Sequence, residues 1–283
     1  MKTALITGAT NGIGLYVARK IATQGFTTII HGRSQTLLDK VVDEIITETS
    51  NNNVFSIKSD FSNLKNVHEM SLEINKQYSS LNLLINNAGA TFTDRATNDD
   101  GHELTLTINY LAPFLLTTNL LPLLRESASN ENHSRVINVS TLGTNDDTDV
   151  PNESDVYWKD LQTNERYSLI KAYWRSKVLL NTFTFHLADL EQVNNVNVNA
   201  VHPGTIITNM TKNIATLGLI ENINDLDEVS YGGERILNLA LSQDLETTTG
   251  QFFTDRQKEL NNDQPDIDSR KKLWEITNNL IGI

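Results

Sequence analysis

Two tyrosine–lysine pairs carry the side chains best suited to moving a proton. Tyr173 and Lys177 are four residues apart, and so are Tyr167 and Lys171, so each pair shares one face of any helix that contains it. A free tyrosine has a pKa of about 10, too high for efficient proton transfer at neutral pH, but a neighbouring ammonium group favours the phenolate and lowers that pKa. Such a tyrosine could donate a proton to a carbonyl oxygen while a hydride reaches the carbon. A Tyr-x-x-x-Lys spacing also arises by chance in many helices, so a catalytic role for either pair needs support from other motifs.

A glycine-rich segment near the N-terminus could bind a phosphate group. The run Thr7-Gly8-Ala9-Thr10-Asn11-Gly12-Ile13-Gly14 follows a strand-like apolar run and opens a helical pattern. Glycine permits a tight turn and close approach to a pyrophosphate, and the start of the helix offers unpaired N–H groups and the positive end of its dipole. This strand–turn–helix context predicts a dinucleotide site. Its expected residues are Gly8, Thr10, Asn11, Gly12, Ile13 and Gly14.

The residues after the second predicted strand indicate which dinucleotide binds. An acidic residue there would bind the ribose 2′-hydroxyl group, whereas an arginine would pair with a 2′-phosphate. The segment His31-Gly32-Arg33-Ser34 has no acidic residue. Arg33 offers a planar fork of donors and Ser34 a hydroxyl group. We therefore expect NADP(H) as the cofactor, with Arg33 and Ser34 at the 2′-phosphate.

The elements that position these residues alternate between strand and helix. Short β-branched runs predict strands at 3–7, 27–31, 54–59, 81–86, 135–140 and 196–202, with a further candidate at 250–253. Helical patterns cover 14–24, 34–49, 64–79, 101–124, 172–191 and 231–240. Such alternation predicts an α/β fold, a doubly wound parallel sheet of the Rossmann type with helices on both faces. We expect one domain over residues 1–283.

Two irregular stretches are expected to be loops near the substrate. Residues 143–171 form an inserted loop and residues 208–229 a substrate-side lid, because loops of this length within a compact domain are usually lids or binding loops. Disordered surface loops are the alternative interpretation.

Composition excludes several functions. The 283 residues include no cysteine, which excludes disulfides, a thiolate nucleophile and a cysteine-based zinc site, and the scattered histidines do not predict a metal site. The formal net charge of −12 repels nucleic acid and anionic membrane surfaces. Without a signal-type segment or a long apolar stretch, we expect no membrane span and a cytoplasmic location.

Several motifs, in order along the chain, resemble those of the short-chain dehydrogenase/reductase family. Thr7-Gly8-x-x-x-Gly12-Ile13-Gly14 is similar to the family's glycine fingerprint, and Asn86-Asn87-Ala88-Gly89 matches its Asn-Asn-Ala-Gly segment. Tyr173-Trp174-Arg175-Ser176-Lys177 reproduces the family's Ser-Lys ending and runs directly into a long helical pattern. The resemblance therefore favours Tyr173 and Lys177 over the pair at positions 167 and 171.

The resemblance implies further roles around a nicotinamide cofactor. Lys177 would bind the nicotinamide ribose, and Asn109 would hold a water molecule that relays protons. Thr141 would orient the substrate, with Ser140 as the alternative, because the family's Asn-Val-Ser-Ser pattern reads Asn-Val-Ser-Thr here. The residues expected around the adenosine half are Asp60, Phe61, Asn87, Ala88 and Gly89, and those around the nicotinamide and pyrophosphate are Pro203, Gly204, Thr205, Ile206 and Thr208.

A narrower resemblance is to the retinol dehydrogenase branch. It rests on the insertion with Asp160-Leu161-Gln162 and on the turn Val201-His202-Pro203-Gly204. This branch implies NADP(H)-dependent interconversion of a lipophilic aldehyde or ketone and its alcohol. A non-catalytic NADP(H)-binding regulator is the alternative. Many relatives pair through helices equivalent to 101–124 and 172–191, which favours a homodimer or homotetramer, although the insertion could interfere.

Overall fold

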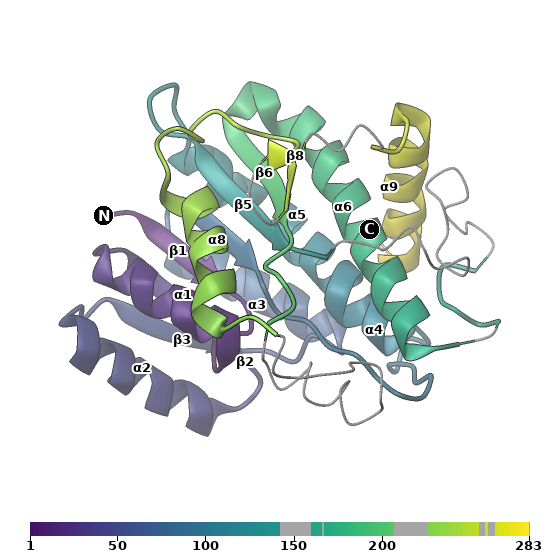
Figure 1. Cartoon of the computed structure of the whole chain (residues 1–283), viewed down its shortest axis with the longest axis horizontal. Helices are drawn as coiled ribbons and strands as arrows, with labels where there is room; N and C mark the ends of the chain where they lie inside the picture. Colours follow the sequence, from purple (N-terminus) through teal and green to yellow (C-terminus); the bar gives the residue numbers. More distant parts are fainter. Residues whose placement is uncertain (142–159, 166, 207–225, 255–257, 260–263, 283) are drawn as a thin grey trace.

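One sheet runs through the computed structural model (Figure 1). The structure describes residues 1–141, 160–165, 167–206, 226–254, 258–259 and 264–282, with the backbone only at 258–259. Within these residues the sheet has eight strands in the order β3-β2-β1-β4-β5-β6-β7-β8, the first seven parallel and β8 antiparallel to β7. The strands are β1 (Thr3–Ile6), β2 (Thr27–Gly32), β3 (Val54–Lys58), β4 (Leu83–Asn86), β5 (Ser134–Val139), β6 (Val196–Val201), β7 (Phe252–Phe253) and β8 (Lys258–Glu259).

The strand order confirms the doubly wound fold. The chain builds outward from β1 through β2 to β3, then returns to place β4 on the other side of β1. Ligands of such sheets bind at the carboxyl ends of the strands, where this reversal opens a crevice. The glycine turn after β1 and the Asn-Asn-Ala-Gly segment after β4 both lie at this reversal.

Helices cover both faces of the sheet. On one face, α1 (Gly12–Thr23), α2 (Gln35–Thr49) and α8 (Val229–Leu241) bury a cluster of aliphatic side chains. On the other, α3 (Leu64–Gln77), α5 (Ala112–Ser127) and α6 (Leu169–Glu191) bury a second cluster. The central strands are buried on both sides, as their continuous apolar runs require.

The region predicted as one helix over 101–124 is divided into three helical segments. It begins as α4 (Leu104–Leu106), where the buried Glu103 carboxylate accepts hydrogen bonds from Thr105 N at 2.8 Å and Leu106 N at 2.7 Å. A π-helical turn, η1 (Thr107–Leu111), follows and leads into α5. The span Leu104–Ser127 is the one described helix apolar and long enough to cross a membrane, but 83% of its apolar window is buried, as in a core helix.

Three described elements near the C-terminal half were not predicted. They are the short helix η3 (Gln192–Asn194), the edge strand β8 and the final helix α9 (Ile267–Ile281). Helix α9 lies against α6, with Trp274 packed on Phe114 and Phe183 at ring-centroid distances of 4.9 and 6.2 Å. The other predicted elements occur with shifts of their ends.

Candidate active site

The hydroxyl of Thr7 joins the ends of β1 and β4. Its Oγ1 accepts hydrogen bonds from Asn87 N at 2.9 Å and Ala88 N at 3.0 Å, and donates to the Ile85 carbonyl at 3.3 Å. Thr7 belongs to the fingerprint but was not singled out as a site residue. Its position between a buried strand and the first glycine is the signal that could have identified it.

The glycines pack the turn tightly against the loop after β4. Gly8 has φ +65°, and a Cβ there would lie 2.8 Å from Ala88 Cα. A Cβ on Gly14 would lie 2.5 Å from both the Gly8 carbonyl oxygen and Asn87 Nδ2. Asn87 Nδ2 donates to the Thr7 and Gly8 carbonyls at 2.9 and 3.2 Å, which holds the turn closed.

The start of α1 is left open to an anion. The helix begins at Gly12, so the N–H groups of its first turn have no partner within the helix. The Asn11 side chain makes no capping hydrogen bond to them. At the end of a compact glycine turn, these amides fit the pyrophosphate of a dinucleotide.

The residues predicted to bind the 2′-phosphate and the adenine lie at the ends of β2 and β3. Arg33 is exposed and makes no hydrogen bond or ion pair within the described residues, while Ser34 Oγ caps α2 by accepting from Leu37 N at 3.4 Å. Asp60 Oδ1 accepts from Ser62 N at 3.0 Å, and the Phe61 ring is buried. Arg33 is thus available to an external phosphate.

Tyr173, Lys177 and Thr141 converge at the end of β5. Lys177 is buried on α6; its Nζ donates to the Val139 carbonyl at 2.8 Å and lies 5.8 Å from the centroid of the Tyr173 ring. The Thr141 side chain hydrogen-bonds the Tyr173 side chain. Ser140 Oγ is turned away and donates to the Lys177 carbonyl at 3.3 Å.

The pKa values at this centre differ from the expectation. Burial raises the pKa of Tyr173 to about 12, although the hydrogen bond with Thr141 lowers it. Burial also lowers the pKa of Lys177 to about 8. The predicted lowering of the Tyr173 pKa by Lys177 is therefore wrong for this structure, because desolvation of the phenolate dominates and the ammonium donates to Val139. At neutral pH the Tyr173 phenol is therefore protonated and Lys177 is largely charged.

Asn109 ties the π-helical turn to two other segments. Its Oδ1 accepts from Ala90 N at 2.8 Å, and its Nδ2 donates to the Ala90 carbonyl and to Ser176 Oγ, both at 3.0 Å. Ser176 Oγ in turn donates to the Tyr173 carbonyl at 2.6 Å. The fully buried Asn109 side chain therefore contacts the helix that carries Tyr173, through Ser176, which was not predicted.

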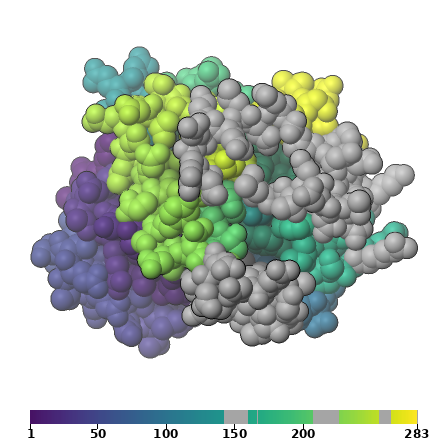
Figure 2. Space-filling view, in the orientation of Figure 1, coloured from purple at the N-terminus to yellow at the C-terminus, as the bar shows by residue number. Residues whose placement is uncertain are grey.

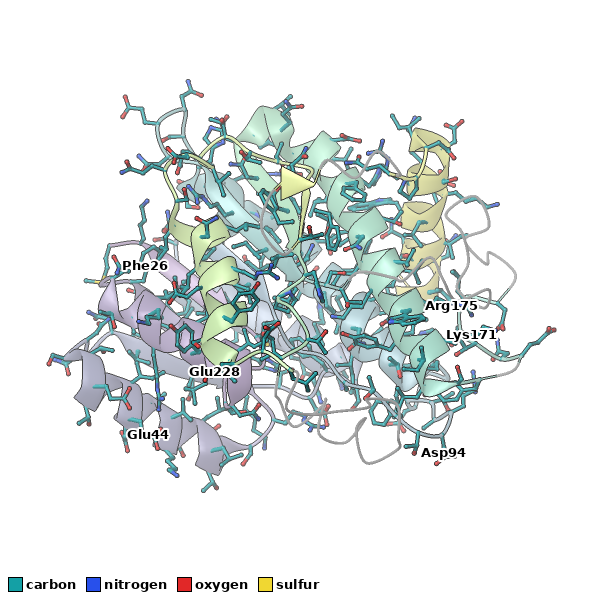
Figure 3. All side chains as sticks on the ribbon, viewed as in Figure 1. Phe26, Glu44, Asp94, Lys171, Arg175 and Glu228 are labelled. Atoms are coloured by element: carbon teal, nitrogen blue, oxygen red, sulfur yellow. The ribbon has the colours of Figure 1, made fainter. Side chains whose placement is uncertain are left out.

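The competing pair at positions 167 and 171 does not share a helix face. Tyr167 precedes α6, which begins at Leu169, and its hydroxyl donates to the Phe92 carbonyl at 2.7 Å. Lys171 lies at the outer end of α6, on the same side of the molecule as Asp94 (Figure 3). This arrangement leaves Tyr173 and Lys177 as the pair with suitable geometry.

The Pro203–Gly204 turn follows β6. The Thr205 carbonyl accepts from Asp227 N at 3.0 Å, and Ile206 is buried. His202 Nδ1 lies 3.4 Å from Thr141 Oγ1, which places this turn beside the reacting centre. Thr208 lies outside the described residues, as do most of the predicted loop and lid.

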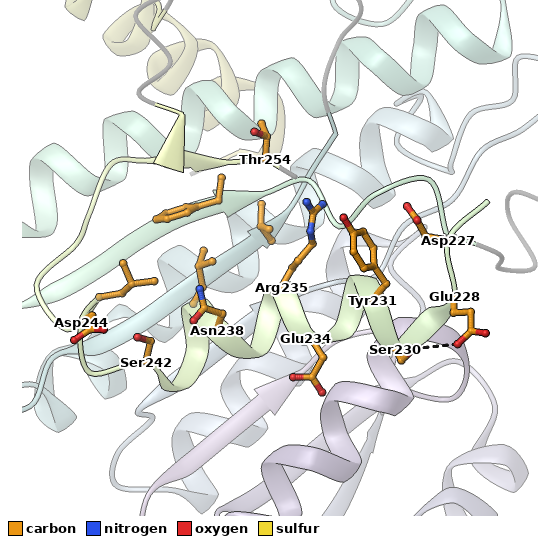
Figure 4. Close-up of a pocket in the computed structure, with 14 residues that line it drawn as sticks. Asp227, Glu228, Ser230, Tyr231, Glu234, Arg235, Asn238, Ser242, Asp244 and Thr254 are labelled. Carbon is orange, nitrogen blue, oxygen red and sulfur yellow. Dashed lines mark hydrogen bonds between the residues drawn. The ribbon is translucent and has the colours of Figure 1, made fainter. Parts of the chain in front are cut away.

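A hollow of about 890 Å³ lies along α8, which forms the light-green ridge in Figure 2. Its apolar lining includes Val201, Leu239 and Phe253, and Asp227, Tyr231 and Arg235 also line it (Figure 4). These three lie beside the turn after β6: a Cβ on Gly204 would lie 2.8 Å from Asp227 Oδ2 and 3.5 Å from Tyr231 Cδ1, and Arg235 donates to the His202 carbonyl at 2.9 Å. Tyr173, Lys177 and Thr141 do not line it. The hollow is thus adjacent to the predicted cofactor site but separate from the reacting centre.

The parallel sheet, the glycine turn and the Tyr173–Lys177 pair together define a short-chain oxidoreductase. Residues 2–150 match the family model for short chain dehydrogenase, and the chain belongs to this family.

Within the family it belongs to the retinol dehydrogenase-like branch. It is 31% identical to retinol dehydrogenase 12 of Mus musculus over the whole chain and 87% of that relative. Solved structures show the same fold at lower identity. The Pseudomonas aeruginosa RhlG/NADP active-site complex has a TM-score of 0.69 and 22% identity, over 89% of this chain and 94% of that one. An NADPH-bound carbonyl reductase from chicken fatty liver has a TM-score of 0.64 and 22% identity, over 90% and 96%.

Proposed function

We propose that this chain is an NADP(H)-dependent oxidoreductase that interconverts a lipophilic aldehyde or ketone and its alcohol. The observation that carries the proposal is the convergence of Tyr173, Thr141 and Lys177 at the end of β5. A glycine turn suited to a dinucleotide lies at the same edge of the sheet.

The residues present fit a nicotinamide dinucleotide. Gly8 and Gly14 let the turn pack closely against the loop after β4, and the first amides of α1 have no partner within the helix and could bind the pyrophosphate. Arg33 and Ser34 would hold a 2′-phosphate, and Lys177 would hold the nicotinamide ribose. The two structural neighbours, one an NADP complex and the other NADPH-bound, support the choice of cofactor. When bound, NADPH supplies the hydride.

The chain's own residues supply the proton. A substrate oxygen beside Thr141 and Tyr173 would accept a hydrogen bond from each hydroxyl group. Because the pKa of Tyr173 is about 12, its phenol is protonated at neutral pH and can transfer its proton to that oxygen as the carbon is reduced. Lys177, held by the Val139 carbonyl, stabilises the phenolate left behind. In the oxidation direction the same groups would act in reverse.

The lipophilic character of the substrate is inferred from the similarity to retinol dehydrogenase 12. One described apolar side chain of the predicted insertion, Leu161, is buried, and Phe92 packs partly buried after β4. These two residues are candidates for an apolar wall of the substrate site.

The test is loss of NADPH absorbance with purified protein against a panel of carbonyl compounds. The panel spans retinal, medium-chain and aromatic aldehydes, cyclic ketones and diketones. We expect turnover that is lost in Tyr173→Phe, a variant that should still bind NADPH. Binding of NADPH without turnover of any carbonyl would support the non-catalytic regulator instead.

A second substitution tests the preference for NADP(H) over NAD(H). Arg33→Glu removes the partner of the 2′-phosphate and adds an acceptor for a free 2′-hydroxyl group. We expect the NADPH/NADH ratio of kcat/KM to fall by about 100-fold or more. An unchanged ratio would refute the role of Arg33.

A further inference from the structure

His31 is a buried histidine that connects two parts of the predicted cofactor site. It lies on β2 with 2% of its surface exposed. Its Nδ1 accepts a hydrogen bond from Gly8 N at 3.2 Å, and its Nε2 lies 3.1 Å from the Ser59 carbonyl oxygen. The imidazole also stacks on Phe61, with ring centroids 4.1 Å apart and planes 16° apart.

The two hydrogen-bond partners fix the protonation state of the ring. A backbone N–H can only donate, and a carbonyl can only accept. Nε2 must therefore carry the hydrogen, and Nδ1 must be unprotonated. A doubly protonated ring would direct a second N–H against the N–H of Gly8, so the neutral ring is the form that fits.

The pKa of His31 agrees with this geometry. It is lowered to about 4: burial lowers it most, the hydrogen bond to Ser59 and the charge of Asp60 oppose this, and the charge of Arg33 adds to it. The ring is therefore neutral throughout the physiological range.

His31 also holds the next amide of the turn through its backbone. Ala9 N donates to the His31 carbonyl at 2.9 Å. The first two amides of the glycine turn are thus bound to one residue of β2, and those at the start of α1 stay open. Ser59 and Phe61, on the other side of the ring, flank Asp60 at the predicted adenine end of the site.

We propose that His31 is a positioning residue for the dinucleotide, whose neutral ring sets the glycine turn relative to the segment Ser59–Asp60–Phe61 after β3. It acts through the Gly8 amide without contacting the reacting atoms. This inference rests on the proposed cofactor binding, but not on the identity of the substrate.

The test compares two substitutions of nearly equal shape. In His31→Asn, Oδ1 takes the place of Nδ1 and can still accept from Gly8 N, whereas His31→Leu has the same branching and no acceptor. NADP⁺ affinity is measured for both on the full chain at pH 7.5. His68→Asn and His68→Leu, at an exposed position of α3, are the matched controls.

We expect His31→Leu to bind NADP⁺ about 10-fold or more weakly than His31→Asn, because Leu leaves the Gly8 amide without its partner. Both variants lose the stacking on Phe61 and the bond to Ser59, so a purely structural role would weaken them equally. Equal affinities for the Asn and Leu variants would overturn the proposal. The two control variants should bind as the wild type does.

A second measurement applies if His31→Leu does not fold. The ¹⁵N shifts of the His31 ring in the wild type report its tautomer, and we expect a hydrogen on Nε2 with no protonation at pH 6. A hydrogen on Nδ1, or titration at an ordinary histidine pKa, would refute the proposal. Failure of the wild type to bind NADP⁺ or NAD⁺ would refute the proposed function itself, whereas wild-type binding with equal Asn and Leu variants refutes only the role of His31.

Discussion

The two neighbouring hydroxyl groups after β5 have different surroundings, and this separates their roles. Ser140 is buried with its Oγ bonded to the carbonyl of Lys177, whereas Thr141 is partly exposed and bonds the Tyr173 side chain. A hydroxyl committed to a helix carbonyl cannot easily reorient toward a substrate. Thr141, the first choice from sequence, therefore has the better geometry for orienting a carbonyl.

Removing the hydroxyl of Thr141 should impair reduction more than removing that of Ser140. Thr141→Val keeps the shape and is expected to lower kcat/KM about 100-fold, because a donor to the developing charge on oxygen is lost. Thr141→Ser should restore most of the activity, and Ser140→Ala should change it by less than about 5-fold. The measurement is steady-state NADPH oxidation, and a larger loss in Ser140→Ala would reverse the assignment.

The pH dependence of reduction should follow Lys177. Its pKa of about 8 means that the ammonium is present below that pH and is lost as pH rises through it, while Tyr173 remains protonated up to about 12. We therefore expect kcat/KM for carbonyl reduction to be level near pH 7 and to fall above about pH 8.

Lys177→Arg provides the control for this profile. Arginine stays charged in this range, so the variant should lack the fall even if its fixed fork lowers the rate at every pH. A wild-type profile that stays level to pH 10 would show that Lys177 does not control the reaction.

At the scale of elements, the sheet could be predicted because its strands are short β-branched runs separated by longer helical patterns. A central parallel strand is buried on both faces and so reads as a continuous apolar run. A helix buried on one face instead alternates apolar and polar residues with a helical period. The predicted strand ends also indicated where the glycine turn, the Asn-Asn-Ala-Gly segment and the residues around position 141 would lie.

The contacts that join these ends could not be predicted. Thr7, His31 and Ser176 act through hydrogen bonds to segments distant in the sequence, which spacing does not reveal. The π-helical turn could not be predicted from spacing either; Asn109 within it is bonded to the loop after β4 and to α6. The sequence pattern did not indicate helix α9 because it buries few apolar side chains, mainly Leu273. The signals at its ends were present, since Asp266 caps its start and Gly282 ends it at φ +74°.

Substituting Asn109 should lower both the stability of the fold and the rate of reduction. Asn109→Ala removes the partners of the Ala90 N–H and carbonyl and of Ser176 Oγ, so we expect the free energy of unfolding to fall by about 1–3 kcal/mol. The rate of reduction should fall as well, because α6 loses its tie to the π-helical turn. Chemical denaturation measures the first effect and NADPH oxidation the second.

A double-mutant cycle with Ser176→Ala tests this interpretation. If the two side chains act as one network, the double variant should lose less stability than the sum of the single variants. Additive losses would show that Asn109 acts through Ala90 alone.

At the scale of the molecule, α9 packs on α5 and α6, the helices through which the family resemblance predicted pairing. Trp274 packs on Phe114 of α5 and Phe183 of α6, and the Tyr110 and Thr277 hydroxyl groups lie 2.5 Å apart. Arg270 of α9 also pairs with Asp189 of α6 at 2.8 Å. Phe114 and Phe183 on this face are thus already in contact with α9 of the same chain.

We therefore predict that this chain does not dimerise through its α5–α6 face. Pairing there would require α9 to leave Trp274, Phe114 and Phe183 exposed, so light scattering over a range of protein concentrations should show either single chains or a dimer that does not use this face. Trp274→Ala should lower the free energy of unfolding by about 2–4 kcal/mol, as expected for truncating a large, partly buried aromatic side chain. A stable dimer whose dissociation constant is unchanged in Trp274→Ala would place the contact elsewhere. A dimer that weakens in this variant would show that α9 itself belongs to the interface, and would contradict the prediction.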